Sequence, residues 1–422
     1  MSSQSFSKSY LLMPFVICIL GSFFYVYDYF LAVAPSVMTH SLMSEFDLSA
    51  AVLGTLMAVF SLASTFFQMP AGMMLDKFGA RKLLSLSVLI SGLGALCFGL
   101  AESKWELALA RLLMGIGSPF AFLGALYLVS RWFSHRYFAF AAGLIQLGAA
   151  LGSIIGGGPL AVLVDHMGWR TSWIWIGWAT LILSLLFWLV LRDGDGTVKG
   201  SALAQETQAK LLDTLKIPQV WWIALVGFCS WVTITGLGSL WGVPYLMAVY
   251  HWDNADIGYL YILFWLGLGL GSPFIGWMSD KMQSRKIPFC ICFGIGFIAS
   301  IFYIEAPLLP KYLMVFVLFF LGFVASAQSL TFGIVKDIVP AKHFVAASGL
   351  INLAAVFTGV IMQPVMGYLM DLHAKSHIEN YTGHYLIKDY QVGLIPVAIV
   401  LLLGFLISFF ALKETHCRVQ KG

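Results

Sequence analysis

An aspartate lies inside the first long apolar stretch of the sequence, where a charged side chain is costly. The segment FYVYDYFLAVAPSVM holds Asp28 and no other charged residue. A carboxylate in such a place needs a proton, a cation or a water-filled cavity. Arg111 is a second charged residue inside an apolar stretch. We therefore expect Asp28 to carry a proton or bind a substrate ammonium group.

Two interpretations of Arg111 remain open at this point. The guanidinium can hold a substrate carboxylate or respond to the proton on Asp28, since Arg presents several charged donors. Alternatively, it packs between helices and donates to backbone carbonyls. A static structural pair between Arg111 and Asp28 is the corresponding alternative for the aspartate.

Tyrosine, amide and indole side chains are the next candidates for a substrate site. Tyr25 and Tyr29 share the helix face of Asp28 in part, whereas Tyr27 points elsewhere. Polar groups at membrane depth need partners, so they line a cavity or bond to a neighbouring helix. The expected proton-coupling or substrate-binding residues are Asp28, Arg111, Tyr25, Tyr29, Gln146, Asn352, Gln328 and Trp231.

Motifs for covalent, nucleotide or metal chemistry are missing from the sequence. It contains no GxxxxGK[ST], GxSxG or HExxH pattern, and its six cysteines form no CxxC pair. ATP hydrolysis is therefore not the expected energy source. The net charge of +4 is too small to indicate a nucleic-acid partner. We expect no enzymatic activity, no cofactor and no metal.

These residues must be positioned by membrane-spanning helices. Hydrophobic residues make up 60% of the 422 residues and charged residues only 10%. A spanning helix needs about 20 mostly apolar residues, and twelve stretches qualify. They are residues 11–37, 50–75, 83–101, 106–131, 138–162, 170–192, 219–247, 256–279, 287–305, 311–335, 343–370 and 390–412.

The positive charges predict the orientation in the bilayer. With a cytoplasmic N-terminus, eighteen of the 24 Lys and Arg residues fall on the inner side and five on the outer side. Positive residues concentrate in cytoplasmic loops. We therefore expect both termini in the cytoplasm, and the bacterial inner membrane as the location.

The sequence repeats itself across its midpoint. Gly72, Asp76, Lys77, Arg81 and Lys82 recur 204 residues later as Gly276, Asp280, Lys281, Arg285 and Lys286. The residues GLIQL from 143 recur as GLINL from 349, and Asp165 recurs as Asp371, both displaced by 206. We expect two related halves: a six-helix bundle over 1–192, a cytoplasmic linker over 193–218 and a second six-helix bundle over 219–422.

The repeated loop resembles the signature loop of the major facilitator superfamily, G-x-x-x-D-[KR]-x-G-x-[RK]-[RK]. Arg111, Gly115 and Gly117 also match the R-x-x-x-G-x-G pattern of that superfamily. The resemblance covers the whole chain and implies an all-α integral membrane fold of twelve helices in two pseudo-symmetric bundles. The charged residues of these loops lie at cytoplasmic helix ends, where ion pairs and helix-end contacts can hold an inner gate shut. We therefore expect a cytoplasmic gate formed by Gly72, Asp76, Lys77, Gly79, Arg81, Lys82, Asp280 and Arg285. Topology-setting charges without a gating role are the alternative.

A narrower resemblance concerns the phagosomal nutrient-transporter branch of intracellular bacteria. FYVYDYFLAVAPSVM, FDLSAAVLGTL and QMPAGMMLDKFGARKLL are similar to that branch. The branch pattern has glutamate in place of Asp28 and arginine in place of Ala32. The resemblance implies uptake of amino acids or nucleosides, and the loss of the arginine leaves the substrate class open.

Together these features predict a secondary transporter that works by alternating access. The expected activity is proton-coupled import of a small polar nutrient, such as an amino acid, a peptide or a nucleoside. Proton-driven export of a drug, metabolite or siderophore is one alternative, and a membrane sensor or scaffold without transport is another. The expected partners are a small-molecule substrate, protons and the lipid bilayer, and the expected state is a monomer.

Overall fold

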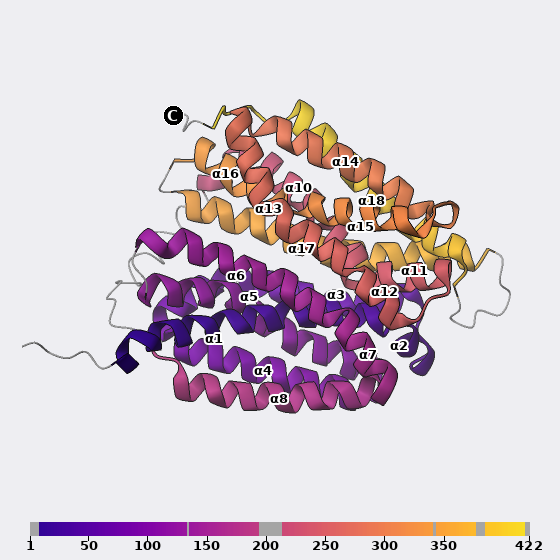
Figure 1. Ribbon diagram of the computed structural model, residues 1–422, viewed down its shortest axis with the longest axis horizontal. Helices are drawn as coiled ribbons and strands as arrows, with labels where there is room; N and C mark the ends of the chain where they lie inside the picture. Colours follow the sequence, from indigo (N-terminus) through magenta and orange to yellow (C-terminus); the bar gives the residue numbers. More distant parts are fainter. Residues whose placement is uncertain (1–7, 133–134, 194–212, 341–342, 377–384, 418–422) are drawn as a thin grey trace, which may run out of the picture.

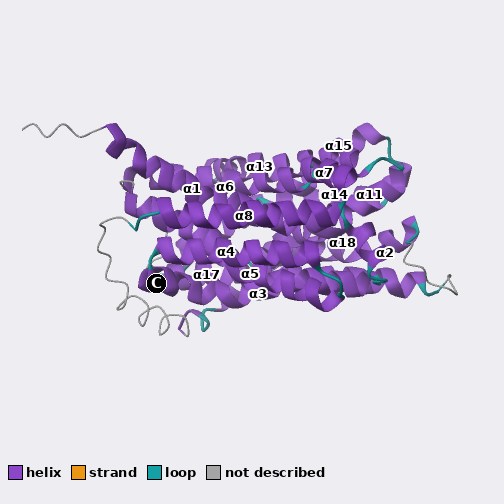
Figure 2. Cartoon of the chain, turned by 90° about the horizontal axis from the view of Figure 1, so that it is seen from below, coloured by secondary structure: helices purple, strands orange, loops and turns teal. Residues whose placement is uncertain are grey.

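The computed structural model describes residues 8–132, 135–193, 213–340, 343–376 and 385–417 (Figure 1). The described residues form helices and connecting loops without a strand (Figure 2). This follows from the bilayer, because a helix satisfies every backbone hydrogen bond within one segment. Twelve of the resulting spans are long and apolar enough to cross a membrane.

The first half of the chain supplies six spans. Its elements are α1 (Lys8–Val33), η1 (Ala34–Val37), α2 (Thr39–Glu45), α3 (Ala50–Phe78), α4 (Ala80–Leu100), α5 (Lys104–Trp132), α6 (His135–Gly156), α7 (Gly158–Met167) and α8 (Trp169–Val190). The second half supplies the other six. Its elements are α10 (Pro218–Val232), η2 (Thr233–Trp241), α11 (Gly242–Tyr250), α12 (Asn254–Leu260), α13 (Ile262–Met282), α14 (Lys286–Ile304), η3 (Ala306–Leu308), α15 (Lys311–Ala325), α16 (Gln328–Ile338), α17 (Phe344–Ala374) and α18 (Ile387–Phe410).

The two sets of helices lie side by side, with the indigo-to-magenta set on one side and the orange-to-yellow set on the other (Figure 1). The start of α1 and the end of α18 lie at the same end of the molecule, on the left in Figure 1. We call it the inner end, because the positive charges predict that it faces the cytoplasm. The opposite end, where α2, α7 and α12 lie, is the outer end.

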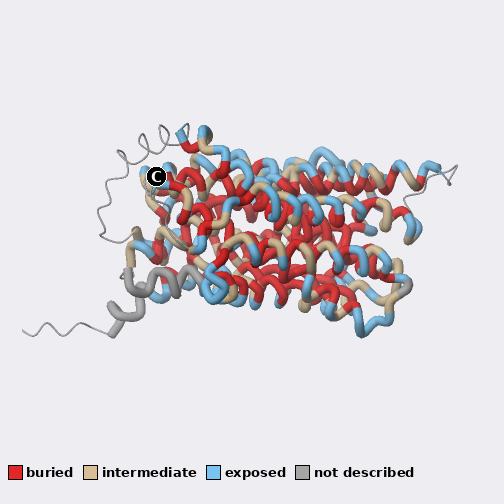
Figure 3. Tube along the Cα trace, turned by 90° about the horizontal axis from the view of Figure 1, so that it is seen from above, coloured by how far each residue is buried: buried red, intermediate tan, exposed pale blue. Residues whose placement is uncertain are grey.

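Burial follows what a bilayer requires of such a bundle. Buried residues concentrate in the interior of the bundle, and many exposed residues lie on its outer surface (Figure 3). Many exposed side chains are large and apolar, among them Phe66 at 75%, Trp105 at 74% and Phe410 at 76% exposure. Apolar surface of this extent suits lipid rather than water.

Several spans are interrupted rather than continuous, a feature that the apolar runs alone did not predict. The fifth span breaks at Gly157, where the sequence reads GGGP, and the eighth breaks at Tyr261. The seventh contains a π-helix over Thr233–Trp241, in the glycine-containing segment TITGLGSLW. π-Helical segments are rare and mark places where a helix is locally deformed.

Candidate functional site

Asp28 lies on α1 and is 9% exposed. The Ser118 hydroxyl on α5 and the Arg111 guanidinium are the polar groups that act on its carboxylate. Among the described residues, no ion pair includes Asp28. The static Asp28–Arg111 pair is thus not formed in this conformation.

Arg111 is committed to the backbone of two other helices. Its Nη1 donates to the Leu31 carbonyl at 2.9 Å, and its Nη2 donates to the Met57 carbonyl at 3.4 Å. The guanidinium also lies over the Phe60 ring, 4.6 Å from its centroid. Arg111 is 2% exposed and bonds to backbone carbonyls in this conformation, which is the geometry of the second interpretation given above.

Depth distinguishes Asp28 from the other carboxylates of the described spans. Asp28 lies nine residues from the nearer end of the span Phe15–Val37, whereas every other Asp or Glu in a span lies within three residues of its end. The others therefore reach the interfacial region, where a charge is tolerated. Among the described residues, Asp28 is thus the one carboxylate that lies deep within its span, where an unpaired charge is costly.

The structure brings Tyr25, Tyr29 and Gln146 together. The Tyr25 hydroxyl donates to Gln146 Oε1 at 2.8 Å, and the Tyr25 and Tyr29 rings meet edge to face at 5.1 Å. Tyr27 instead stacks on Phe30 at 5.9 Å, away from this group. Gln146 is exposed on α6.

A glycine makes this arrangement possible. A Cβ at Gly152 of α6 would lie 1.9 Å from the Val26 carbonyl oxygen of α1. Only a residue without a side chain permits such an approach of two backbones. The close contact holds the tyrosine face of α1 against α6.

The second half contributes a separate polar group. Gln328 of α16 is 6% exposed, and its Oε1 accepts from the Ser230 hydroxyl of α10 at 3.1 Å. Its Nε2 has no partner among the described residues. Trp231 follows Ser230 and is half-buried, as is Asn352 of α17. No described hydrogen bond connects this group with Asp28, Tyr25 or Gln146.

The halves are joined at their outer ends. The described hydrogen bonds between the two halves link Ala50 and Ala51 to Asp371, Ala50 to Tyr385, and Asn254 to Val37 and Asp165. All of these residues lie at the outer end. At the inner end the described hydrogen bonds stay within each half, so the conformation is closed on the outer side.

The signature loop of the first half is fastened within that half. Gly79 has φ +80°, a conformation that favours glycine, and its N–H donates to the Leu75 carbonyl. The Arg81 N–H donates to Asp193 Oδ1 at 2.8 Å, and its Nε donates to the Trp188 carbonyl at 2.9 Å. Gly72 has open space where a side chain would be. The positive charge of Arg131 acts on Asp76. Lys77 lies over Phe78 at 5.2 Å, and Lys82 is exposed.

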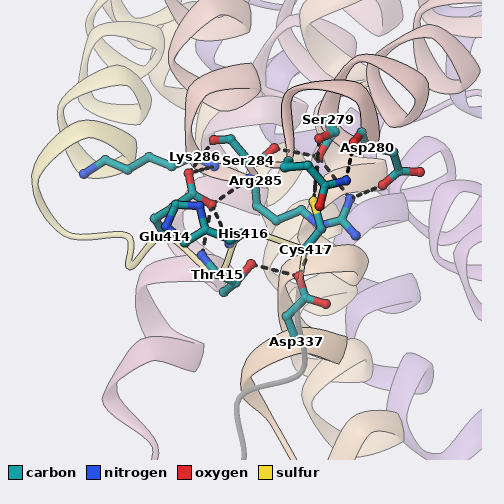
Figure 4. Close-up of polar contacts among 11 residues, drawn as sticks. Ser279, Asp280, Ser284, Arg285, Lys286, Asp337, Glu414, Thr415, His416 and Cys417 are labelled. Carbon is teal, nitrogen blue, oxygen red and sulfur yellow. Dashed lines mark hydrogen bonds and ion pairs between the residues drawn. The ribbon is translucent and has the colours of Figure 1, made fainter.

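The second loop forms a larger polar cluster (Figure 4). Arg285 pairs with Asp280 at 3.0 Å and with Asp337 at 3.1 Å. Glu414, in the segment after α18, accepts the N–H groups of Arg285 at 2.9 Å and Lys286 at 3.3 Å, together with the Ser284 hydroxyl. These bonds satisfy the exposed first turn of α14.

The hydrogen bonds also set the charge of Glu414. Burial raises the pKa of this carboxyl, but the Ser284 hydroxyl and the N–H groups of Arg285, His416 and Lys286 outweigh that effect. Its pKa therefore lies below the ordinary value for glutamate. Glu414 stays charged where it caps the helix.

Three residues of these inner clusters were missed by the sequence reasoning: Asp193, Asp337 and Glu414. A signal for two of them exists, because each half ends its sixth span with leucine, a basic residue and an acid. These are Leu191, Arg192 and Asp193 in the first half and Leu412, Lys413 and Glu414 in the second. In both halves the carboxylate of this acid accepts backbone N–H groups at the start of the helix that follows the signature loop.

Comparisons with known proteins agree with this architecture. The family model described as Major Facilitator Superfamily matches residues 18–357 and 223–418. The uncharacterized transporter YybO of Bacillus subtilis is 23% identical over 417 residues, covering 92% of each chain. The probable sulfoacetate transporter SauU of Cupriavidus necator is 25% identical and covers 80% of this chain and 82% of its own. The probable L-galactonate transporter of Escherichia coli is 22% identical, with 80% and 78% covered.

A solved structure has the same fold. The bacterial homolog of the human lysosomal transporter Spinster, in an inward-facing and occupied conformation, superposes with a TM-score of 0.77 at 17% identity. The match covers 95% of this chain and 97% of that one. None of these four proteins is named as a phagosomal nutrient transporter, so that narrower assignment stays a prediction.

Proposed function

The chain belongs to the major facilitator superfamily, and we propose that it couples the import of a small polar nutrient to protons by alternating access. The family and its transporter relatives make it a secondary transporter rather than an enzyme. The nutrient, the proton coupling and the direction of transport are the proposal.

The observation that carries the proposal is Asp28. It is a buried carboxylate far from either end of its span, beside a serine hydroxyl and without an ion pair among the described residues. A group in this position can bind a proton when the site is closed to water and release it when water enters. That cycle is what coupling to a proton gradient requires.

The substrate would lie between the two halves near the middle of the bilayer. Tyr25, Tyr29 and Gln146 would contact it from the first half, and Gln328, Asn352 and Trp231 from the second. Arg111 would join the site only if another conformation releases it from the carbonyls of Leu31 and Met57.

The polar groups favour a small substrate rich in hydrogen-bonding atoms. Amino acids, peptides and nucleosides fit this description. The names of two relatives add organic acids, sulfoacetate and L-galactonate, to the compounds worth testing. We place the protein in the bacterial inner membrane, as a monomer with both termini in the cytoplasm.

Uptake by purified protein in liposomes tests this function. A thermal-shift screen first selects compounds that stabilise the protein, since a ligand at 100 times its Kd adds about 2.7 kcal/mol. Uptake of a selected compound should then rise when the outside is made acidic and fall with a protonophore. Uptake unchanged by either would contradict proton coupling, and proton-driven loss from preloaded vesicles would indicate export. Binding without any counterflow would favour a sensor.

A further inference from the structure

An aspartate of the second half caps a helix of the first half at the outer end. Asp371, near the end of α17, accepts the Ala50 N–H through Oδ1 and the Ala51 N–H through Oδ2, each at 3.1 Å. These two N–H groups belong to the first turn of α3, where the helix itself offers them no partner. The negative charge also lies at the positive end of the helix dipole. Asp371 is only 6% exposed.

A tyrosine reinforces this cap. The Tyr385 hydroxyl donates to Asp371 Oδ1 and accepts from the Ala50 N–H at 2.7 Å. Tyr385 lies just before α18 and Asp371 lies near the end of α17, so two successive spans of the second half both bind the start of α3. Its hydroxyl fixes which way the carboxylate faces.

The repeat-related aspartate of the first half also bonds to the other half at the outer end, although it accepts from a side-chain amide and not from the backbone of a helix. Asp165, near the end of α7 in the first half, accepts from Asn254 Nδ2 at 3.4 Å, at the first residue of α12 in the second half. Asn254 Nδ2 also donates to the Val37 carbonyl at 2.7 Å. Asp165 and Asp371 are related by the 206-residue displacement of the repeat, and Asn254 and Ala50 by the 204-residue displacement.

Both carboxylates lie where the backbones of the two halves touch. A Cβ at Gly367 of α17 would lie 2.2 Å from the Ala50 carbonyl oxygen. A Cβ at Gly258 of α12 would lie 2.8 Å from the Gly158 backbone of α7. Opening the outer end must separate these surfaces, and that separation breaks the bonds to Asp371 and Asp165.

We propose that Asp371 and Asp165 form the outer latch of the transport cycle, a pair of positioning residues that hold the outer end closed. Asp371 is the stronger member, because it is buried and accepts three charge-assisted bonds, two of them from the other half, whereas Asp165 is exposed and accepts one long bond. The inference rests on alternating-access transport as proposed above, but not on the substrate, the direction or the proton. When the outer end opens, water replaces the partners of both carboxylates, so the latch releases in every cycle.

A reporter cysteine measures the opening directly. Ser36 in η1 is 1% exposed, and η1 packs against η2 and α11 of the second half. In protein lacking its six native cysteines, Ser36→Cys should react slowly with a maleimide in detergent, because the closed outer end covers it. Asp371→Asn should raise the rate about tenfold, since it removes the charge and one acceptor. Asp165→Asn should raise it less, and Asp371→Glu should restore slow labelling in part.

Glu45→Gln is the matched control. Glu45 is also an outer carboxylate, but its partners lie within the first half. It forms an ion pair with Arg170 at 2.7 Å and accepts a hydrogen bond from Trp169 Nε1 at 2.7 Å. Its loss should leave the labelling rate unchanged. Tyr385→Phe gives a second route to the same result should Asp371→Asn fail to fold, and should also speed labelling.

Gel filtration and thermal unfolding first establish that Asp371→Asn and Tyr385→Phe are folded. If both folded variants are then labelled no faster than Glu45→Gln, the latch proposal is wrong. The assay needs no substrate or gradient. A failure of proton-coupled import therefore leaves this result untouched, and the absence of a latch leaves the import proposal standing.

Discussion

At the scale of single residues, the two charges at membrane depth have different surroundings. Arg111 donates from Nη1 and Nη2 to carbonyls of α1 and α3 and lies over an aromatic ring, while its Nε has no partner among the described residues. Asp28 has a serine neighbour and no ion pair among the described residues. In this conformation the carboxylate therefore has fewer bonded partners than the guanidinium.

Replacing Asp28 with asparagine should separate coupling from binding. Asp28→Asn keeps the size of the side chain but cannot exchange a proton, so gradient-driven uptake should fall at least about tenfold, the scale of losing one essential charged group. Counterflow of the same substrate should survive, because exchange needs no net proton movement. Glu305→Gln, at an exposed outer position, is the control that should change neither rate. Full gradient-driven uptake in Asp28→Asn would return the residue to a structural role.

Removal of the Arg111 side chain should act on stability. Arg111→Ala removes the bonds to both carbonyls and leaves the Leu31 carbonyl without a donor, because Pro35 offers no N–H; the cost is about 1–3 kcal/mol. The melting temperature should drop, while the affinity for substrate in the remaining folded protein stays the same. A loss of affinity with an unchanged melting temperature would instead place Arg111 in the substrate site.

At the scale of elements, glycines decide how closely the helices approach one another. A Cβ at Gly152 would collide with the Val26 carbonyl, whereas a Cβ at Gly349 of α17 would have nothing within 4 Å. The two residues lie in the corresponding fifth spans of the two halves. Replacing either glycine with alanine therefore adds the same methyl group, at a crowded position in one case and at an open position in the other.

Alanine at these two positions should have opposite effects. Gly152→Ala should lower stability by about 1–3 kcal/mol, because overpacking forces α1 and α6 apart. Gly349→Ala should be neutral or slightly stabilising, because alanine favours the helix. Thermal unfolding in detergent measures both. Equal melting temperatures for the two variants would contradict the close contact of α1 with α6.

The segment after α18 should make stability depend on pH. The pKa of Glu414 is lower in the folded protein than its ordinary value, since the hydrogen bonds outweigh burial. Its contribution is therefore present above the ordinary glutamate pKa, about 4.3, and is lost as the pH falls through the lower folded value. Wild type should melt higher than Glu414→Gln at neutral pH, and the difference should vanish on acidification. A difference that persists at the lowest pH would exclude the charge of Glu414 as its cause.

At the scale of the whole molecule, the described inner and outer ends are built differently. Outer hydrogen bonds cross between the halves, whereas the inner clusters around Arg81 and Arg285 stay within one half each. The inner clusters thus shape each half as a unit that can move. The outer contacts decide whether the two units are apart or together.

The positive charges predict the orientation in the membrane, and fusions test this prediction. A fluorescent reporter that matures only in the cytoplasm should be bright at either terminus, and alkaline phosphatase should be inactive there. Phosphatase fused after Arg170, which lies at the outer end, should be active. Phosphatase activity at the C-terminus would reverse the assignment of the inner end.

The sequence by itself determined the number of spans, their approximate bounds and the relation of the two halves. The bilayer explains this, because each span must be a long apolar helix whatever its neighbours are. It also singled out Asp28, since a lone charge inside an apolar run needs no fold to be noticed.

Only the tertiary structure decided which partners the polar groups take. Arg111 bonds to carbonyls 80 and 54 residues away in the chain, and Asp371 caps a helix 321 residues away. The closure of the outer end and the partner of each carboxylate depend on how the two halves meet. The interface between the halves depends on how their surfaces pack in one conformation of the cycle. The residue pattern along a single helix does not predict it.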